Sequence, residues 1–217
     1  MLYTSKAIVL HSVKYRDNSF IVTMLTRQFG RMAYVFHKAK SKKSGNRAAF
    51  LQPLNLLEIT AYHNPKKNVQ NLKEIRLATA CNNIPQCAEK TAIALFVSEI
   101  VNKSLWRTEK DEYLFDFIES SLVVLDKIET NFANYHLIFL MKLTKFLGFE
   151  PSPNYRNYKY FDQINGEFAA QNPQHEYFFK NDEVEHFNSL IGKEFDQMSE
   201  LKFNRATRNS TLQNLLD

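Results

Sequence analysis

Five short runs rich in β-branched and aromatic residues follow one another at the start of the chain, and turn signals separate them. The runs are Ser5–Val13, Ser19–Thr26, Arg31–His37, Leu54–Tyr62 and Val69–Arg76. Runs of this length, bounded by Gly, Pro, Asn and Asp, predict β-strands. Five such strands in succession are typical of a small closed β-barrel.

The pattern changes after residue 80. Pro85 suits the first turn of a helix, and apolar residues then recur at helical spacing. Helices are predicted over residues 88–105, 111–127, 131–148, 182–191 and 205–216. Prolines and aromatic residues crowd residues 149–180, where Asn165-Gly166 predicts a hairpin. The sequence thus predicts an α+β fold in two domains: a barrel over residues 1–80 and an all-α domain over residues 81–217 with an irregular, hairpin-containing insertion.

The charge of the chain is divided between these two parts. Residues 1–80 hold 14 Lys and Arg against three acids, Asp17, Glu58 and Glu74, which gives a net charge of +11. Residues 81–217 hold 14 Lys and Arg against 20 acids, a net charge of −6. Such asymmetry indicates two modules with different partners, of which the first should attract polyanions.

A basic run between the third and fourth predicted strands carries the strongest signal. Lys38, Lys40, Lys42, Lys43 and Arg47 lie within ten residues, with no acid among them. Phosphate is the commonest partner of such a run, although a solvated loop also accounts for it. Small five-stranded barrels bind oligonucleotides on the face of strands 2 and 3 and in the loops joining strands 1–2 and 4–5.

The predicted DNA-contacting set therefore combines cations for phosphates with tyrosines on which bases can stack. The phosphate partners are Lys14, Arg16, Arg27, Arg31, Lys38, Lys40, Lys42, Lys43, Arg47, Lys66 and Lys67, and the stacking candidates are Tyr15 and Tyr62. For the two tyrosines, packing in the protein and stacking on a base are about equally good interpretations. Because no helix suited to reading a DNA groove is evident, the binding is expected to be non-specific.

Several function classes are disfavoured by what the sequence lacks. It contains no P-loop, no G-x-S-x-G and no H-E-x-x-H motif. The shortage of carboxylates in the barrel leaves no pair for acid–base or two-metal chemistry. We therefore expect neither an enzyme nor a cofactor. No apolar run approaches the roughly 20 residues of a membrane span, and Met1 to Val13 lacks a signal-peptide core. A cytoplasmic, nucleoid-associated protein without a membrane partner is expected.

Four segments resemble the family of the recombination mediator and DNA repair protein RecO. They are Lys6–Tyr15, Ile21–Arg31, Leu51–Glu58 and Leu147–Pro151, and the T-R-x-x-G-R and L-Q-P-x-x-L-L-E patterns are the most specific pieces. The resemblance implies an OB-fold followed by a helical domain. It also implies binding to single- and double-stranded DNA, annealing of complementary strands, and loading of RecA together with RecR and single-stranded DNA-binding protein.

The chain departs from this family at one point. Many relatives carry a C-x-x-C…C-x-x-C zinc site after the segment that corresponds to Leu147–Pro151. Here the first pair aligns with Tyr155 and Tyr158, and no second cysteine pair follows. Four thiolates are what such a site requires. We therefore expect no zinc, and a small aromatic core in residues 155–179 in place of the metal.

The resemblance further implies that the acidic tail of single-stranded DNA-binding protein docks on the helical domain. An apolar side chain beside cations is suited to this, as at Trp106 with Arg107, or at Arg205 and Arg208. Packing at a helix end is the competing interpretation of Trp106. The alternative for the whole chain is a non-enzymatic protein-assembly adaptor whose basic barrel binds an acidic protein.

Overall fold

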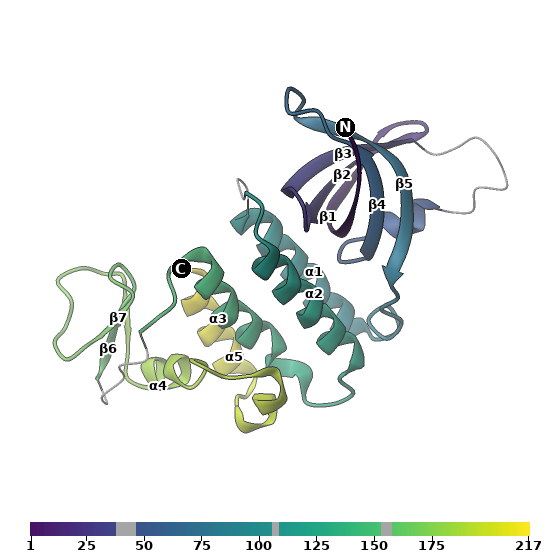
Figure 1. Cartoon of the computed structure of the whole chain (residues 1–217). Coiled ribbons are helices and arrows are strands. Elements are labelled where there is room, and N and C mark those ends of the chain that lie inside the picture. The colour runs from purple at the N-terminus through teal and green to yellow at the C-terminus, as the bar shows by residue number, and fades with distance from the viewer. Residues whose placement is uncertain (38–46, 106–108, 153–157) are drawn as a thin grey trace. The chain divides into compact units, whose positions relative to one another are not determined.

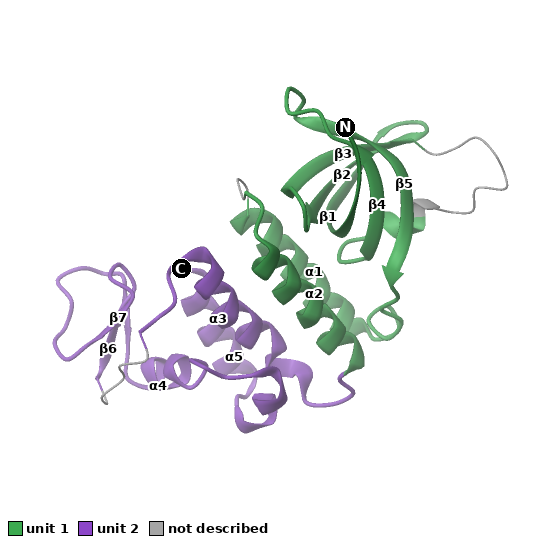
Figure 2. Cartoon of the chain, viewed as in Figure 1, with its two compact units in different colours: residues 1–127 green, residues 128–217 purple. Residues whose placement is uncertain are grey.

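The computed structural model describes residues 1–37, 47–105, 109–152 and 158–217, and the chain divides into two compact units, residues 1–127 and 128–217 (Figures 1 and 2). Unit 1 begins with a closed barrel in the strand order β1-β2-β3-β5-β4. Its strands are β1 (Leu2–Arg16), β2 (Ser19–Thr26), β3 (Gly30–His37), β4 (Leu56–Tyr62) and β5 (Val69–Thr79). The predicted five-stranded barrel and the helical region after it are confirmed.

The barrel closes because β1 is long enough to pair on both sides. Its first half pairs with β4, and its second half pairs with β2. Inward side chains alternate along every strand, and the core includes Tyr3, Val9, Met24 and Ile59. Gly30 adopts a φ of +66°, which glycine tolerates better than other residues, and it lets the β2–β3 turn close tightly.

One row of apolar side chains points out of the barrel and is nevertheless buried. Leu25, Ile8 and Leu56 are cross-strand partners on β2, β1 and β4, and each is at most 1% exposed. Helices α1 (Ala88–Ser104) and α2 (Glu112–Lys127) follow the barrel in unit 1. The helix pair is tied to this side of the barrel, because the Ser98 hydroxyl donates to the Leu10 carbonyl at 2.8 Å and because α2 is ion-paired to strand residues.

The two helices therefore belong to the same compact unit as the barrel. The linker before α1 is pinned as well: the Asp126 carboxylate accepts the backbone N–H groups of Asn83 and Ile84 at 2.8 and 2.9 Å. The Lys90 ammonium donates to the Asp126 carbonyl at 2.8 Å. A domain boundary at residue 80 stays a prediction, since unit 1 extends to Lys127.

Unit 2 contains three helices and a small sheet. The helices are α3 (Tyr135–Leu147), α4 (Asp182–Asn188) and α5 (Arg205–Leu216), and the sheet has the order β7-β6-β8 with β6 (Tyr160–Asp162), β7 (Glu167–Ala169) and β8 (Phe178–Lys180). Gly148 ends α3 with a φ of +83°. The predicted hairpin corresponds to β6 and β7, which Asn165-Gly166 connects.

Phenylalanine rings hold this sheet together. The Phe161 ring centroid lies 5.1 Å from that of Phe168, 4.9 Å from that of Phe179 and 4.5 Å from that of Phe187 on α4. Among the described residues, no group of three His, Cys, Asp or Glu side chains is placed to hold a metal ion. Tyr155, expected at the first position of the lost cysteine pair, lies outside the described residues. That the chain binds no zinc remains a prediction.

Asp162 fixes the loop between β6 and β7. Its carboxylate accepts hydrogen bonds from the backbone of Ile164 and from both the backbone and the side chain of Asn165. It also lies 3.2 Å from His175 Nε2. Because His175 Nδ1 accepts the Tyr177 N–H, the ring proton sits on Nε2 and is donated to Asp162. Burial raises the pKa of Asp162, but these bonds outweigh it and lower the pKa below the ordinary 3.8.

The lowered pKa predicts a pH-dependent effect of Asp162→Asn. A carboxylate with a depressed folded pKa stabilises the protein above its unfolded pKa, and this contribution is lost as the pH falls through the folded pKa. At pH 7 the variant should lose about 1.5 kcal/mol of unfolding free energy. The loss should shrink below pH 3.8. Urea denaturation across pH measures it, with Glu167→Gln on exposed β7 as the control; an equal loss at every pH contradicts the assignment.

The buried outward row predicts how fragments of unit 1 behave. A fragment of residues 1–127 should unfold in one cooperative thermal transition as a monomer. A fragment of residues 1–80 would expose Ile8, Leu25 and Leu56, and such an apolar patch promotes association. Light scattering and calorimetry on the two fragments check this. A monomeric, cooperatively folded 1–80 fragment would show that α1 and α2 are dispensable for the barrel.

Candidate nucleic-acid interface

Another row of outward-facing side chains on the barrel, unlike the row of Ile8, Leu25 and Leu56, is open to solvent. Val13 on β1, Ile21 on β2, Val35 on β3 and Asn71 on β5 are successive cross-strand partners. They point outward, because Val22, which alternates with Ile21, is fully buried in the core. Val13 is 43% exposed, and Ile21 and Val35 are half-buried. An exposed apolar row on a small barrel is a typical contact surface.

A second row runs beside the first. His11, Thr23, Ala33 and Val69 are cross-strand partners in the same strand order. Val69 is 39% exposed, and His11 is exposed as well. We call these two rows of eight residues the outer sheet face. It contains no carboxylate, so nothing in it repels a phosphate.

The β1–β2 loop borders one end of the outer sheet face. The predicted residues Lys14, Tyr15 and Arg16 come together here, and all three are exposed. The Arg16 guanidinium carbon lies 5.2 Å from the Tyr15 ring centroid, a cation–π contact that orients both groups. Tyr15 is 54% exposed, which leaves ring area free for stacking.

The β4–β5 loop borders the other end, just before Val69. Buried Gln70 shapes it: its amide oxygen accepts the Asn64 N–H at 2.8 Å, and its amide nitrogen donates to the carbonyls of Asn64 and Lys67 at 3.0 and 2.6 Å. The Asn64 side chain in turn accepts the Lys66 N–H at 3.0 Å. The loop therefore presents Lys66 and Lys67 on a backbone held at several points, and both side chains are exposed.

Aromatic rings join this loop to the β2–β3 turn. His63 stacks on Phe29 with ring centroids 4.2 Å apart, and Tyr3 meets Phe29 edge-on at 4.6 Å. The amino group of Met1 donates to the His63 carbonyl at 3.0 Å. Tyr62, the second stacking candidate, is 48% exposed beside them. The β2–β3 turn and the β4–β5 loop consequently form one end of the barrel.

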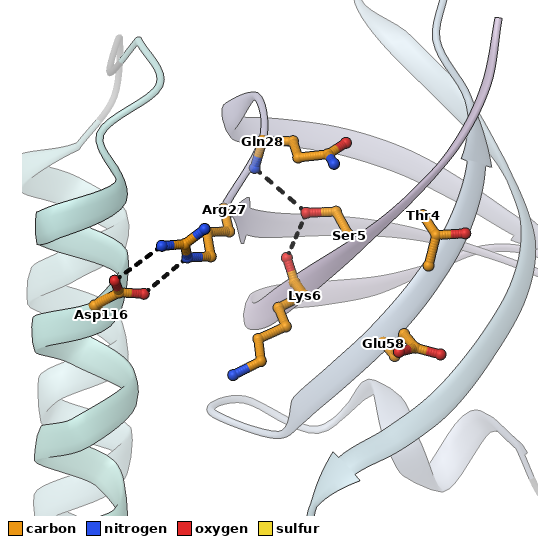
Figure 3. Close-up of a pocket in the computed structure, with 7 residues that line it drawn as sticks. All are labelled: Thr4, Ser5, Lys6, Arg27, Gln28, Glu58 and Asp116. Carbon is orange, nitrogen blue, oxygen red and sulfur yellow. Dashed lines mark hydrogen bonds and ion pairs between the residues drawn. The ribbon is translucent and has the colours of Figure 1, made fainter.

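Two predicted phosphate partners are engaged by the helices of unit 1 instead of standing free. Arg27 donates to Asp116 at 2.9 and 3.1 Å (Figure 3). It also lies 2.7 Å from Glu112. The hydrogen bond with Asp116 raises the pKa of Arg27, and the same bond lowers the pKa of Asp116. Arg31 donates to the Asn102 side chain at 3.0 Å.

The remaining predicted residues fall into two groups. Lys38, Lys40, Lys42 and Lys43 lie outside the described residues, as do Trp106 and Arg107, and Arg47 begins a short 3₁₀ helix, Arg47–Leu51, with its side chain outside the description. Arg205 and Arg208 lie on α5 in unit 2. Arg205 is exposed, and half-buried Arg208 donates to the Phe203 carbonyl at 2.8 Å. Among the described residues, the structure groups Lys14, Tyr15 and Arg16 at the end of β1, and it groups Tyr62, Lys66 and Lys67 around the β4–β5 loop.

Sequence reasoning missed the outer sheet face and Gln70. Strand alternation marks Val13, Ile21 and Val35 as one side of their strands, but only the register shows that they form a row. Gln70 gives no signal at all, because a glutamine that bonds a loop backbone looks like any polar residue in a strand. None of the helices in the described part of the chain combines the length and apolar character that a bilayer crossing needs.

Comparisons with known proteins cover the whole chain. The family model described as recombination protein O N terminal matches residues 1–81, and recombination protein O C terminal matches residues 86–217. The chain is 34% identical to a DNA repair protein RecO of Azobacteroides pseudotrichonymphae over 100% of its own length and 90% of that protein. It is 32% identical to a DNA repair protein RecO of Phocaeicola vulgatus, over 98% of this chain and 88% of that protein. It is 35% identical to a DNA repair protein RecO of Flavobacterium psychrophilum, over 97% of this chain and 84% of that protein.

The geometry of the β4–β5 loop predicts the effect of Gln70→Ala. The substitution leaves three backbone groups of the loop without their partner, so we expect a loss of about 1–2 kcal/mol in unfolding free energy. The Asn64 amide should also exchange its hydrogen faster. Urea denaturation and hydrogen exchange measure the two effects. The neighbouring exposed Asn71→Ala serves as control and should change stability by less than about 0.5 kcal/mol; equal effects would remove Gln70 as the organiser of the loop.

Proposed function

Because the chain belongs to the recombination protein O family of DNA repair proteins, we propose that it is a recombination mediator whose barrel binds DNA without sequence preference. The observation that carries this is the arrangement of the outer sheet face. The outer sheet face, which carries no carboxylate, is bordered at one end by exposed Lys14, Tyr15 and Arg16 at the end of β1. At the other end lie exposed Lys66 and Lys67 in the β4–β5 loop, which follows exposed Tyr62. Cations at the ends suit the phosphates of a nucleic-acid strand, and the surface between them suits its bases.

In the proposed complex, phosphates contact Lys14 and Arg16 at one end and Lys66 and Lys67 at the other. Bases lie against the outer sheet face between them. Stacking on an exposed aromatic ring contributes roughly 1–3 kcal/mol per base and tolerates any sequence. Tyr15 and Tyr62 are the rings placed for it. The basic residues 38–47 extend the same charge, and the proposal includes Lys38, Lys40, Lys42, Lys43 and Arg47 as further phosphate partners.

Binding of this kind supports strand annealing. Two complementary strands repel each other through their phosphates, and a basic surface that engages both lowers that repulsion. Bases held by stacking alone keep their pairing edges available. The same cations serve double-stranded DNA, since phosphate contacts carry no sequence information. The process needs no nucleotide hydrolysis, in keeping with a chain that has no P-loop motif.

Membership of this family supports a further proposal about the partners. We propose that the chain acts with RecR and with single-stranded DNA-binding protein to load RecA on coated single strands, in the cytoplasm at the nucleoid. For the acidic tail of single-stranded DNA-binding protein, exposed Arg205 on α5 remains the candidate within the described residues. Trp106 with Arg107 remains a candidate outside them, whereas Arg208 already donates to a backbone carbonyl.

The proposal predicts a salt-dependent loss of affinity in Lys66→Gln/Lys67→Gln. Removing two phosphate contacts should weaken binding to a labelled single-stranded oligonucleotide, and the log–log slope against salt should become shallower by about 1.4 units. Fluorescence anisotropy across a salt series measures both, and a strand-annealing assay without ATP follows the activity.

The matched control is Lys180→Gln/Lys202→Gln, which removes the same charge from exposed positions of unit 2. It should leave both affinity and slope close to those of the wild type. Equal losses in the two variants would reduce the effect to net charge alone. If the affinity of the wild-type chain for the oligonucleotide did not depend on salt, the protein-assembly adaptor would be favoured over the mediator.

A further inference from the structure

Helix α2 directs a stripe of acids at the barrel. Glu112, Asp116 and Glu119 lie four and three residues apart, so they share one face of the helix. Each contacts a strand or turn cation: Glu112 and Asp116 lie 2.7 and 2.9 Å from Arg27, and Glu119 accepts from Lys6 at 2.8 and 3.0 Å. The stripe therefore neutralises two cations of a barrel whose charge is otherwise strongly positive.

Lys6 and Arg27, the two cations that these acids mask, adjoin the proposed DNA surface. Arg27 begins the β2–β3 turn, and two residues later Phe29 stacks on His63 at the start of the β4–β5 loop. That loop carries Lys66 and Lys67. The Arg27 backbone N–H donates to the Lys6 carbonyl at 3.1 Å, so the two masked cations are neighbours as well. Without α2, the positive surface would continue from the β4–β5 loop across the β2–β3 turn.

The contact at Arg27 resembles the one that a phosphate would make. Asp116 binds the guanidinium with two parallel hydrogen bonds, the geometry in which arginine also holds a phosphate. Arg27 is not sealed in: its side chain is 40% exposed. Open cavities of about 470 and 620 Å³ lie beside the pair, and Arg27 and Asp116 line both. Figure 3 shows the first of them, with Arg27 and Lys6 reaching across its edge toward α2. An incoming anion therefore has space next to the guanidinium.

We propose that the carboxylates of Glu112, Asp116 and Glu119 are an intramolecular competitor for DNA phosphate. They occupy Arg27 and Lys6 and so keep a bound strand away from the β2–β3 turn beside the β4–β5 loop. This inference rests on the proposed function, because it requires that the barrel bind DNA. It assigns α2 the task of setting how many barrel cations a strand can reach.

The test neutralises the competitor at Arg27. Glu112→Gln/Asp116→Asn keeps the size and hydrogen-bonding capacity of both side chains but frees the guanidinium for a phosphate. Single-stranded oligonucleotide should bind several-fold tighter, and the log–log salt slope should steepen by about 0.7 units, one additional contact. Adding Arg27→Gln to this variant should abolish the gain, whereas Arg27→Gln alone should have a smaller effect on the wild type.

The matched control is Glu89→Gln/Glu99→Gln, which removes two exposed carboxylates from α1 without touching a barrel cation. Its salt slope should equal that of the wild type. A gain of the same size in the control, or a gain that survives Arg27→Gln, overturns the inference while leaving the proposed function intact. Absence of salt-sensitive binding in the wild type overturns both. Thermal melts confirm that each variant is folded, since exposed ion pairs contribute at most about 1 kcal/mol.

Discussion

The burial of the outward row Leu25–Ile8–Leu56, on the barrel to which α1 is hydrogen-bonded, determines what the rest of the barrel can do. Apolar side chains on the outside of a small barrel are either covered by other parts of the protein or form a surface that contacts a ligand. Covering this row divides the exterior in two. The stretch with Val13, Ile21 and Val35 is left open, and it becomes the surface on which a ligand can lie.

Covering part of a basic barrel also has an electrostatic consequence. Acids on a helix that lies beside positive strands can pair with the lysines and arginines there. Helix α2 does so at Lys6 and Arg27, whose side chains stay 52% and 40% exposed, so each pair adds little to stability. In the proposal above, the same pairs remove two cations from the surface that DNA could reach. Docking of the helices and selection of the nucleic-acid path would then share one set of contacts.

The sequence predicted those features that depend on neighbours in the chain. Strand runs, the Gly30 turn, the end of α3 at Gly148 and the Asn165-Gly166 hairpin all follow local rules. The exposed cations at the β1–β2 and β4–β5 loops were predicted for the same reason, and their contact with DNA stays a prediction. Arg27 was predicted to contact DNA from its charge alone, because composition does not show its partner Asp116, which lies 89 residues away. The third strand of the small sheet, β8, was not predicted, because no short turn signal such as Asn165-Gly166 connects it to its partner β6.

The small sheet of unit 2 is held by side chains that, among the described residues, include no group placed to bind a metal ion. A zinc ion would fix four backbone points at once. Here Phe161 contacts three other rings, and Asp162 next to it binds the loop backbone and His175. The rings bury apolar surface, and the carboxylate fixes the loop through directional hydrogen bonds. Two adjacent residues thus hold both the core and the loop of the sheet. Because burial responds weakly to pH and the carboxylate strongly, acid should loosen the loop before the ring cluster.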